Sequence, residues 1–269
     1  MAQAVFVENN SFEPGYLGKL AFMIPILSFY PPVIAHRGAR SNAPENTLAA
    51  IRLAREQGAG WVEVDVKLTQ DGIPILMHDE TLERTTNGKG LVAEASWQDL
   101  RMLDAGTWFG AHFANERIPT LTETLHCVLD SGLRINLEIK PCPGRAQATT
   151  MVSLMETAKI WPEDVLPPLI SSLNIECLQI ADQLLPHWPR GLLFDEWDED
   201  WLRLAEKAHA DTIHLSEKIL NSGRIKNLIR SERPILAYTV NDPHRANDLL
   251  SQGISAVFSD NPKEILAAL

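Results

Sequence analysis

The sequence predicts an α/β fold: a closed (β/α)8 TIM barrel, with eight parallel strands, a helix after each strand and a small insertion after the second strand. Short apolar segments alternate with segments of helical spacing, and this order is typical of a parallel sheet. The predicted strand centres are Val33, Val62, Ile135, Ile170, Leu192, Ile213, Leu236 and Val257. Polar residues follow several of these segments, and the C-terminal ends of barrel strands are where active sites of this fold lie.

Composition limits the class of protein. The chain has 269 residues, 45% of them hydrophobic, which is enough for one large core. Its formal net charge of −11 disfavours a nucleic-acid surface and a basic membrane patch. The cysteines, Cys127, Cys142 and Cys177, are odd in number and widely spaced, which favours a reducing compartment over a disulfide framework. We therefore expect a cytoplasmic protein that binds no nucleic acid.

Residues 1–31 are predicted to form an N-terminal extension ahead of a barrel domain at 32–269. The apolar run at residues 20–30 is about half the length that a membrane span needs, so we expect no stable membrane anchor. Lys19 before the run is compatible with a signal peptide, whereas Pro25 within it favours an extension that packs on the domain.

The first predicted strand ends in His36, Arg37 and Gly38. A histidine can transfer a proton near neutral pH, and an arginine presents a planar fork of donors suited to phosphate. The glycine allows a sharp turn or the close approach of a ligand. This segment is therefore a candidate for phosphate-ester chemistry.

The second predicted strand, residues 61–68, alternates strictly between apolar and polar residues, so Glu63 and Asp65 share one face. Valines occupy the other face, as expected for the side that packs against helices. We expect both carboxylates to point into the barrel, where a divalent cation would neutralise them. The alternative is an exposed edge strand on which both carboxylates are solvated.

A hairpin follows this strand. The pair Asp71-Gly72 predicts a two-residue turn, and that register places His78 opposite Asp65. Residues 80–119 then interrupt the alternation of strands and helices. We expect them to form the insertion, lying over one face of the domain.

The next barrel strand repeats the pattern of the second, because Glu138 and Lys140 share a face. Glu138 is a candidate for a third oxygen ligand and Lys140 for a phosphate-binding cation. An internal ion pair between the two is the alternative. Oxygen ligands suit Mg²⁺ or Ca²⁺, and two histidines beside such a cation suit acid–base chemistry on a phosphate ester.

From about residue 33 to its C-terminus, the sequence resembles the glycerophosphodiester phosphodiesterase family of the cytosolic bacterial type. The resemblance rests on ordered motifs: HRG at 36–38, PENT at 44–47, EVDV at 63–66, TQDG at 69–72, HD at 78–79, TLERTTNG at 81–88, LEIK at 137–140, TVND at 239–242 and SDNP at 259–262.

The resemblance implies hydrolysis of glycerophosphodiesters, such as glycerophosphocholine, to sn-glycerol 3-phosphate and an alcohol. One histidine would deprotonate the glycerol 2-hydroxyl, which attacks phosphorus, and the other would protonate the leaving alcohol before water opens the cyclic phosphate. The implied roles are as follows: one cation, Mg²⁺ or Ca²⁺, on Glu63, Asp65 and Glu138; acid and base, His36 and His78; phosphate binding, Arg37 and Lys140.

Phe194 and Tyr238 fall at late strand ends and are candidates for the mouth of the site; core packing is the alternative for Phe194. Tyr238 stands where family members often carry tryptophan. One alternative function is a lysophospholipase D-like activity, with lipid contacts from Trp108, Phe109 and Phe113. The other is a barrel that binds a phosphodiester without turnover. The sequence leaves the oligomeric state open, a homo-oligomer included.

Overall fold

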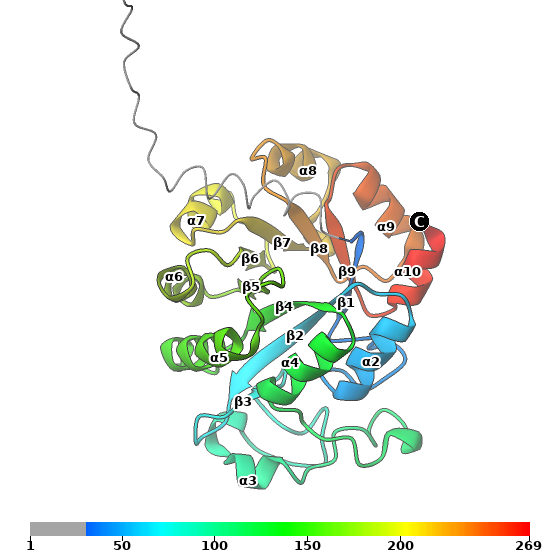
Figure 1. The fold of residues 1–269 in the computed structure, drawn as a ribbon. Coiled ribbons are helices and arrows are strands. Elements are labelled where there is room, and N and C mark those ends of the chain that lie inside the picture. The colour runs from blue at the N-terminus through cyan, green and yellow to red at the C-terminus, as the bar shows by residue number, and fades with distance from the viewer. Residues whose placement is uncertain (1–30) are drawn as a thin grey trace, which may run out of the picture. The chain divides into compact units, whose positions relative to one another are not determined.

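The computed structural model describes residues 31–269, so the apolar run at 20–30 lies outside the described residues. Eight parallel strands form a closed barrel, because β1 pairs with β9 on one side and with β2 on the other (Figure 1). The barrel strands are β1 (Val33–His36), β2 (Trp61–Leu68), β4 (Arg134–Ile139), β5 (Leu169–Ser172), β6 (Arg190–Phe194), β7 (Thr212–Ser216), β8 (Ile235–Tyr238) and β9 (Ala256–Ser259). Every predicted strand centre lies in one of them, and the predicted fold class is confirmed.

Helices surround the barrel (Figure 1). They are α2 (Leu48–Glu56), α4 (Leu121–Asp130), α5 (Ala146–Ile160), α6 (Ile175–Leu184), α7 (Trp201–Lys207), α8 (Ser222–Ile229), α9 (Pro243–Ser251) and α10 (Pro262–Ala268). Several begin at a polar side chain that accepts a hydrogen bond from the first turn. At α4, Thr120 and Glu123 form a reciprocal capping box. Such caps fix where each helix starts, because they satisfy amide groups that the helix leaves unpaired.

Strand β2 carries the alternation that positions the site. Val62, Val64 and Val66 are fully buried in the core shared with the surrounding helices. Successive side chains of a strand point to opposite faces, so Glu63 and Asp65 face the barrel interior. Because β2 pairs with both β1 and β4, it is not an edge strand, and the alternative of solvated carboxylates is wrong.

The hairpin register differs from the prediction by one residue. Strand β3 (Pro74–Leu76) runs antiparallel to β2, and the amide of Met77 donates to the carbonyl of Asp65 at 3.0 Å. Met77, and not His78, therefore lies opposite Asp65. The turn is one residue longer than predicted, at 70–72, since Gly72 adopts a positive φ of 83° that ends a three-residue loop.

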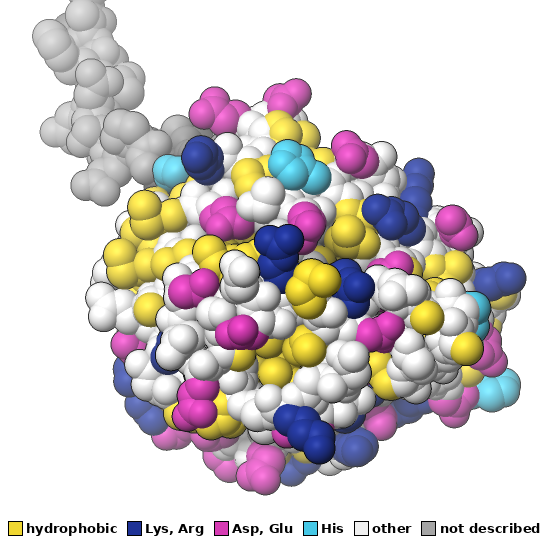
Figure 2. All heavy atoms as spheres, turned by 90° about the horizontal axis from the view of Figure 1, so that it is seen from below, with side chains coloured by type: hydrophobic (Ala, Val, Ile, Leu, Met, Phe, Trp, Pro, Cys, Tyr) yellow, Lys and Arg dark blue, Asp and Glu magenta, His cyan; other side chains and the backbone are white. Residues whose placement is uncertain are grey.

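Residues 80–119 lie beside β3 and form no barrel strand (Figure 1). They contain α3 (Trp97–Leu100) and two short 3₁₀ turns, Val92–Glu94 and Ala111–Phe113. A small core joins their Leu82 and Leu100 to Ile75 of β3. Figure 2 views the molecule from below, and acidic and basic side chains are interspersed on that face. No helix within residues 31–269 is long and apolar enough to cross a bilayer.

Candidate active site

A cavity of about 290 Å³ opens at the C-terminal ends of the barrel strands. Of the residues predicted from the sequence, it is lined by His36, Arg37, Glu63, His78, Glu138, Lys140 and Tyr238. They come from the ends of β1, β2, β4 and β8 and from the segment after β3. The structure therefore brings most of the predicted site together at one place, as the barrel fold requires.

Three carboxylates form the acidic part of the site. Glu63, Asp65 and Glu138 each offer an oxygen, and these oxygens all lie within 4.8 Å of one another. The β2–β4 register sets this arrangement, because it places Asp65 beside Glu138. Glu63 Oε1 is buried and has no hydrogen-bond partner among the described residues. A divalent cation fits this set, since it would satisfy that oxygen and neutralise the buried charges.

The protonation of the carboxylates reflects their crowding. Burial, reinforced by the charges of Asp65 and Glu138, raises the pKa of Glu63. Burial and the charge of Asp65 likewise raise the pKa of Glu138 to about 7, against the pull of Lys140. Burial also opposes ionisation of Asp65, but Arg37 and Lys140 outweigh it and lower the pKa of Asp65. Ionising all three carboxylates would therefore place more negative charge in the site than Arg37 and Lys140 balance.

Arg37 and Lys140 line the same cavity as the carboxylates Glu63 and Glu138. Arg37 Nε lies 3.2 Å from Asp65 Oδ2, and its amide donates to Glu63 Oε2 at 3.0 Å. Lys140 Nζ lies 3.1 Å from Glu138 Oε1 and 3.7 Å from Asp65 Oδ1. The ion pair between Glu138 and Lys140 is therefore present, in a cavity that also leaves both side chains accessible to a ligand.

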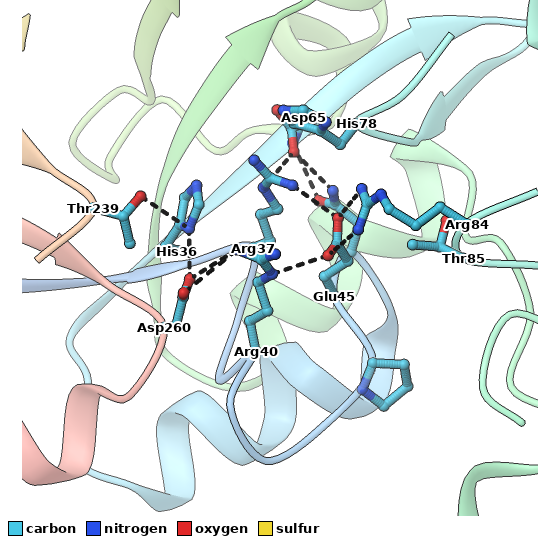
Figure 3. Close-up of polar contacts among 12 residues, drawn as sticks. His36, Arg37, Arg40, Glu45, Asp65, His78, Arg84, Thr85, Thr239 and Asp260 are labelled. Carbon is cyan, nitrogen blue, oxygen red and sulfur yellow. Dashed lines mark hydrogen bonds and ion pairs between the residues drawn. The ribbon is translucent and has the colours of Figure 1, made fainter. Parts of the chain in front are cut away.

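Each of the two histidines is paired with an aspartate, and Figure 3 shows the pair of His36 and Asp260. His36 donates from Nδ1 to Asp260 Oδ1 at 2.7 Å, and His78 donates from Nδ1 to Asp79 Oδ1 at 2.6 Å. In each neutral ring the carboxylate fixes the tautomer with the proton on Nδ1 and leaves Nε2 as the unprotonated nitrogen. Burial lowers the pKa of both imidazoles below the ordinary value.

Further residues take part that were not predicted as site residues. Glu45 accepts hydrogen bonds from Arg37, Arg40 and Arg84, which places it behind the cavity wall (Figure 3). Asp79 and Asp260 orient the histidines. Their signal in the sequence is their position inside the PENT, HD and SDNP motifs, which mark the family but do not give these contacts.

Of the two residues predicted at late strand ends, Tyr238 lines the cavity and Phe194 does not. Tyr238 lines the cavity, and its hydroxyl donates to Asp195 Oδ1 at 2.7 Å. Phe194 instead packs in the core with Trp201 and does not line the cavity, so the structure does not place it at the mouth. Strand parity is the reason: Leu193 and Asp195, on either side of Phe194 in the chain, face the cavity.

The fold and the site together define a (β/α)8 barrel with a cluster of three carboxylates beside two histidines. The chain belongs to the glycerophosphoryl diester phosphodiesterase family, whose sequence model matches residues 36–264. The family predicted from the motifs is thereby confirmed.

Individual relatives span nearly the whole barrel. The chain is 34% identical over 241 residues to a glycerophosphodiester phosphodiesterase of Caldanaerobacter subterraneus, covering 87% of this chain and 96% of that protein. It is 30% identical over 238 residues to the putative glycerophosphodiester phosphodiesterase YhdW of Bacillus subtilis, with coverage of 87% and 96%. Among solved structures, a phosphodiesterase of Oleispira antarctica in complex with the product sn-glycerol-3-phosphate superimposes with a TM-score of 0.87 at 40% identity, covering 90% of this chain and 97% of that one.

Proposed function

We propose that the protein hydrolyses glycerophosphodiesters, such as glycerophosphocholine or glycerophosphoethanolamine, to sn-glycerol 3-phosphate and an alcohol. The observation that carries this proposal is one cavity lined by Arg37, Lys140 and two histidines paired with aspartates, beside a cluster of three carboxylates. The Oleispira antarctica relative, with sn-glycerol-3-phosphate bound, supports the choice of product.

Glu63, Asp65 and Glu138 would hold one divalent cation, Mg²⁺ or Ca²⁺. The chemistry of the donors supports this, since all three offer oxygens and Glu63 Oε1 has no other partner among the described residues. When bound, the cation would supply positive charge to the phosphate and lower the pKa of a coordinated hydroxyl.

The histidines would act as acid and base. Nε2 of one ring would take the proton of the glycerol 2-hydroxyl, whose oxygen then bonds to phosphorus. Nε2 of the other would protonate the alcohol oxygen as its bond to phosphorus breaks, which yields a cyclic phosphate that water opens in a second step. Arg37 and Lys140 would bind the phosphate oxygens and stabilise the charge that develops on them.

Tyr238 would form the wall against which the substrate's carbon atoms pack, next to Leu193 and Phe258. Its hydrogen bond to Asp195 supports this role, because it holds the ring in one orientation. For Phe194 the core position supports packing, and not substrate contact.

We also propose that this activity is cytoplasmic. The support is the cysteines, which are free and buried at Cys127, Cys142 and Cys177. The partner would be the small-molecule substrate, and the net charge of −11 argues against nucleic acid.

The first test measures release of glycerol 3-phosphate from glycerophosphocholine and glycerophosphoethanolamine. The protein is stripped of metal and then supplied with Mg²⁺ or Ca²⁺. We expect release that depends on the added cation, is lost in Glu63→Gln and is kept in Glu176→Gln, which changes an exposed glutamate on α6.

Other results would redirect the proposal. Release that survives complete metal removal would contradict the cation's role. Product from lysophosphatidylcholine alone would favour a lysophospholipase D-like enzyme, with Trp108, 40% exposed on the insertion, as a lipid contact. Tight binding of glycerophosphocholine without product would favour a binding protein.

A further inference from the structure

Glu45 lies outside the catalytic cavity, and its side chain is almost fully buried. It is connected to both histidines by chains of charged residues, and Figure 3 shows the one that reaches His36 through Arg40 and Asp260. Each chain runs from Glu45 through one arginine and one aspartate to an imidazole. We call the chain through Arg40 and Asp260 the His36 arm, and the chain through Arg84 and Asp79 the His78 arm.

The His36 arm joins the loop after β1 to the loop after β9. Arg40 Nε donates to Glu45 Oε2 at 2.9 Å, and Arg40 Nη1 donates to Asp260 Oδ1 at 3.3 Å. Asp260 in turn accepts from His36 Nδ1 at 2.7 Å. A second donor, Asn241 Nδ2, lies 2.9 Å from Asp260 Oδ2 and holds the aspartate from the other side.

The His78 arm joins the same glutamate to the insertion. Arg84 donates from Nη1 and Nη2 to the two oxygens of Glu45, both at 2.8 Å. The same guanidinium donates from Nε to Asp79 Oδ2 at 2.6 Å, and Asp79 Oδ1 accepts from His78 Nδ1 at 2.6 Å. Two-point contacts of this kind fix orientation as well as distance.

The carboxylate of Glu45 is therefore saturated. Its two oxygens accept four N–H groups: one from Arg37, one from Arg40 and two from Arg84. Burial opposes its ionisation, but hydrogen bonds from Arg84 and the charge of Arg37 lower the pKa of Glu45 to about 2. Charges thus alternate along both arms, and Glu45 is the one anion that the two arms share.

We propose that Glu45 is a positioning residue that fixes the two histidines relative to each other. The consequence for rate rests on the proposed function, in which acid and base must reach opposite ends of one phosphodiester. An error of about 1 Å in such placement can cost about 10²-fold in rate. A shared anchor sets that separation even though His36 and His78 belong to different elements, β1 and the segment after β3.

The first test needs no turnover, so it is independent of the proposed function. Side-chain ¹H–¹⁵N spectra of ¹⁵N-histidine-labelled protein report the tautomer and order of each ring, with His36→Gln and His78→Gln for assignment. We expect Glu45→Gln to shift the signals of both rings. We expect Arg40→Gln to shift only those of His36 and Arg84→Gln only those of His78.

The second test is kinetic. With glycerophosphocholine, we expect Glu45→Gln to lower kcat about 10²-fold with little change in KM. The leaving group of glycerophospho-p-nitrophenol departs without a proton, so this substrate needs no acid. With it, one of the two single-arm variants, Arg40→Gln or Arg84→Gln, should recover activity, and the histidine of that arm is then the acid. Glu217→Gln is the matched control. Glu217 Oε2 lies 3.4 Å from Arg245 Nε, and neither residue lines the cavity.

Three results would overturn the proposal. One is a spectrum of Glu45→Gln in which only one ring, or neither, changes. Another is a raised KM with unchanged kcat, which would mean that Glu45 acts through Arg37 on phosphate binding. The third applies if Glu45→Gln does not fold, when the single-arm variants decide. Histidine ring signals that stay unchanged in Arg40→Gln and also in Arg84→Gln would refute the two arms.

Discussion

His36 Nε2 lies 3.9 Å from Glu63 Oε2, because the register of β1 and β2 places the two residues side by side. The proposed proton-transfer atom is therefore adjacent to the proposed cation site. A group that transfers a proton next to a bound cation acts on an oxygen that the cation polarises. The fold alone therefore places the proposed acid–base group, His36, beside the proposed cation ligand, Glu63.

Cation binding should be measurable as stability. A ligand that binds only the folded state at 100 times its Kd adds about 2.7 kcal/mol to the free energy of unfolding. We expect Mg²⁺ or Ca²⁺ to raise the Tm of metal-stripped protein, and Glu138→Gln to remove most of that rise. Differential scanning calorimetry with Glu176→Gln as control measures it. An equal rise in Glu138→Gln would exclude Glu138 as a ligand.

Gly38 should tolerate no side chain. Its φ is +84°, and an added Cβ would lie 2.6 Å from the backbone carbon of Ala50. We expect Gly38→Ala to cost about 3 kcal/mol, the sum of the left-handed backbone and the steric overlap. Gly132, with φ +64° and open space around it, is the matched control at about 1 kcal/mol. Urea unfolding compares the two, and equal costs would show that the contact with Ala50 relaxes freely.

His214 should make the fold sensitive to acid. Burial lowers the pKa of this ring from 6.5 to about 3. The unfolded chain therefore binds an extra proton between these values, so the free energy of unfolding falls as pH drops below 6.5, by up to about 1.4 kcal/mol per pH unit. In urea titrations at pH 7 and pH 5, we expect His214→Asn to lose about 2 kcal/mol less than the wild type on acidification. The same loss in both would assign the acid sensitivity to other groups.

Tyr238 and Phe194 should separate function from stability. Replacing Tyr238 with leucine removes part of the cavity wall, so we expect KM to rise about 10-fold, a loss of about 1.4 kcal/mol in substrate binding. Phe194→Leu removes core packing, so we expect about 1 kcal/mol lower stability and an unchanged KM. Steady-state kinetics and urea unfolding of both variants check this. A raised KM in Phe194→Leu with an unchanged KM in Tyr238→Leu would show that Phe194, and not Tyr238, contacts the substrate.

A two-histidine mechanism predicts a bell-shaped dependence of rate on pH, because His36 and His78 must hold opposite protonation states. The measurement is kcat/KM for glycerophosphocholine across the range in which imidazoles titrate. A profile that stays flat from about pH 5 to about pH 9 would contradict the mechanism. Loss of only one limb in His36→Gln would assign the role of that residue.

The sequence could predict what depends on local periodicity. The alternation in residues 61–68 predicted a strand with Glu63 facing inward, and the structure agrees. Residues 190–194 carry no such alternation, so the sequence alone could not decide whether Phe194 or its neighbours face the cavity. The hairpin register was wrong because it depends on the conformation of Gly72, which residue type alone does not determine.

The sequence could not predict the contacts of Glu45. Its arginine partners Arg40 and Arg84 come from loops without periodicity, and Asp260 lies at the other end of the chain. The contact between Arg40 and Asp260 exists only once β1 and β9 have paired. Motif order indicated that these residues matter for membership of the family, but not what they bind.

The hairpin between β2 and the insertion also limits how this protein can be recombined with its relatives. His78 stands just before residues 80–119, whereas Arg84, which holds it through Asp79, stands within them. A chimera that exchanges residues 80–119 alone would keep the host's Glu45 and Asp79 but replace Arg84, which contacts both. The first crossover point should therefore fall after residue 84, so that Arg84, Asp79 and both histidines all come from the host.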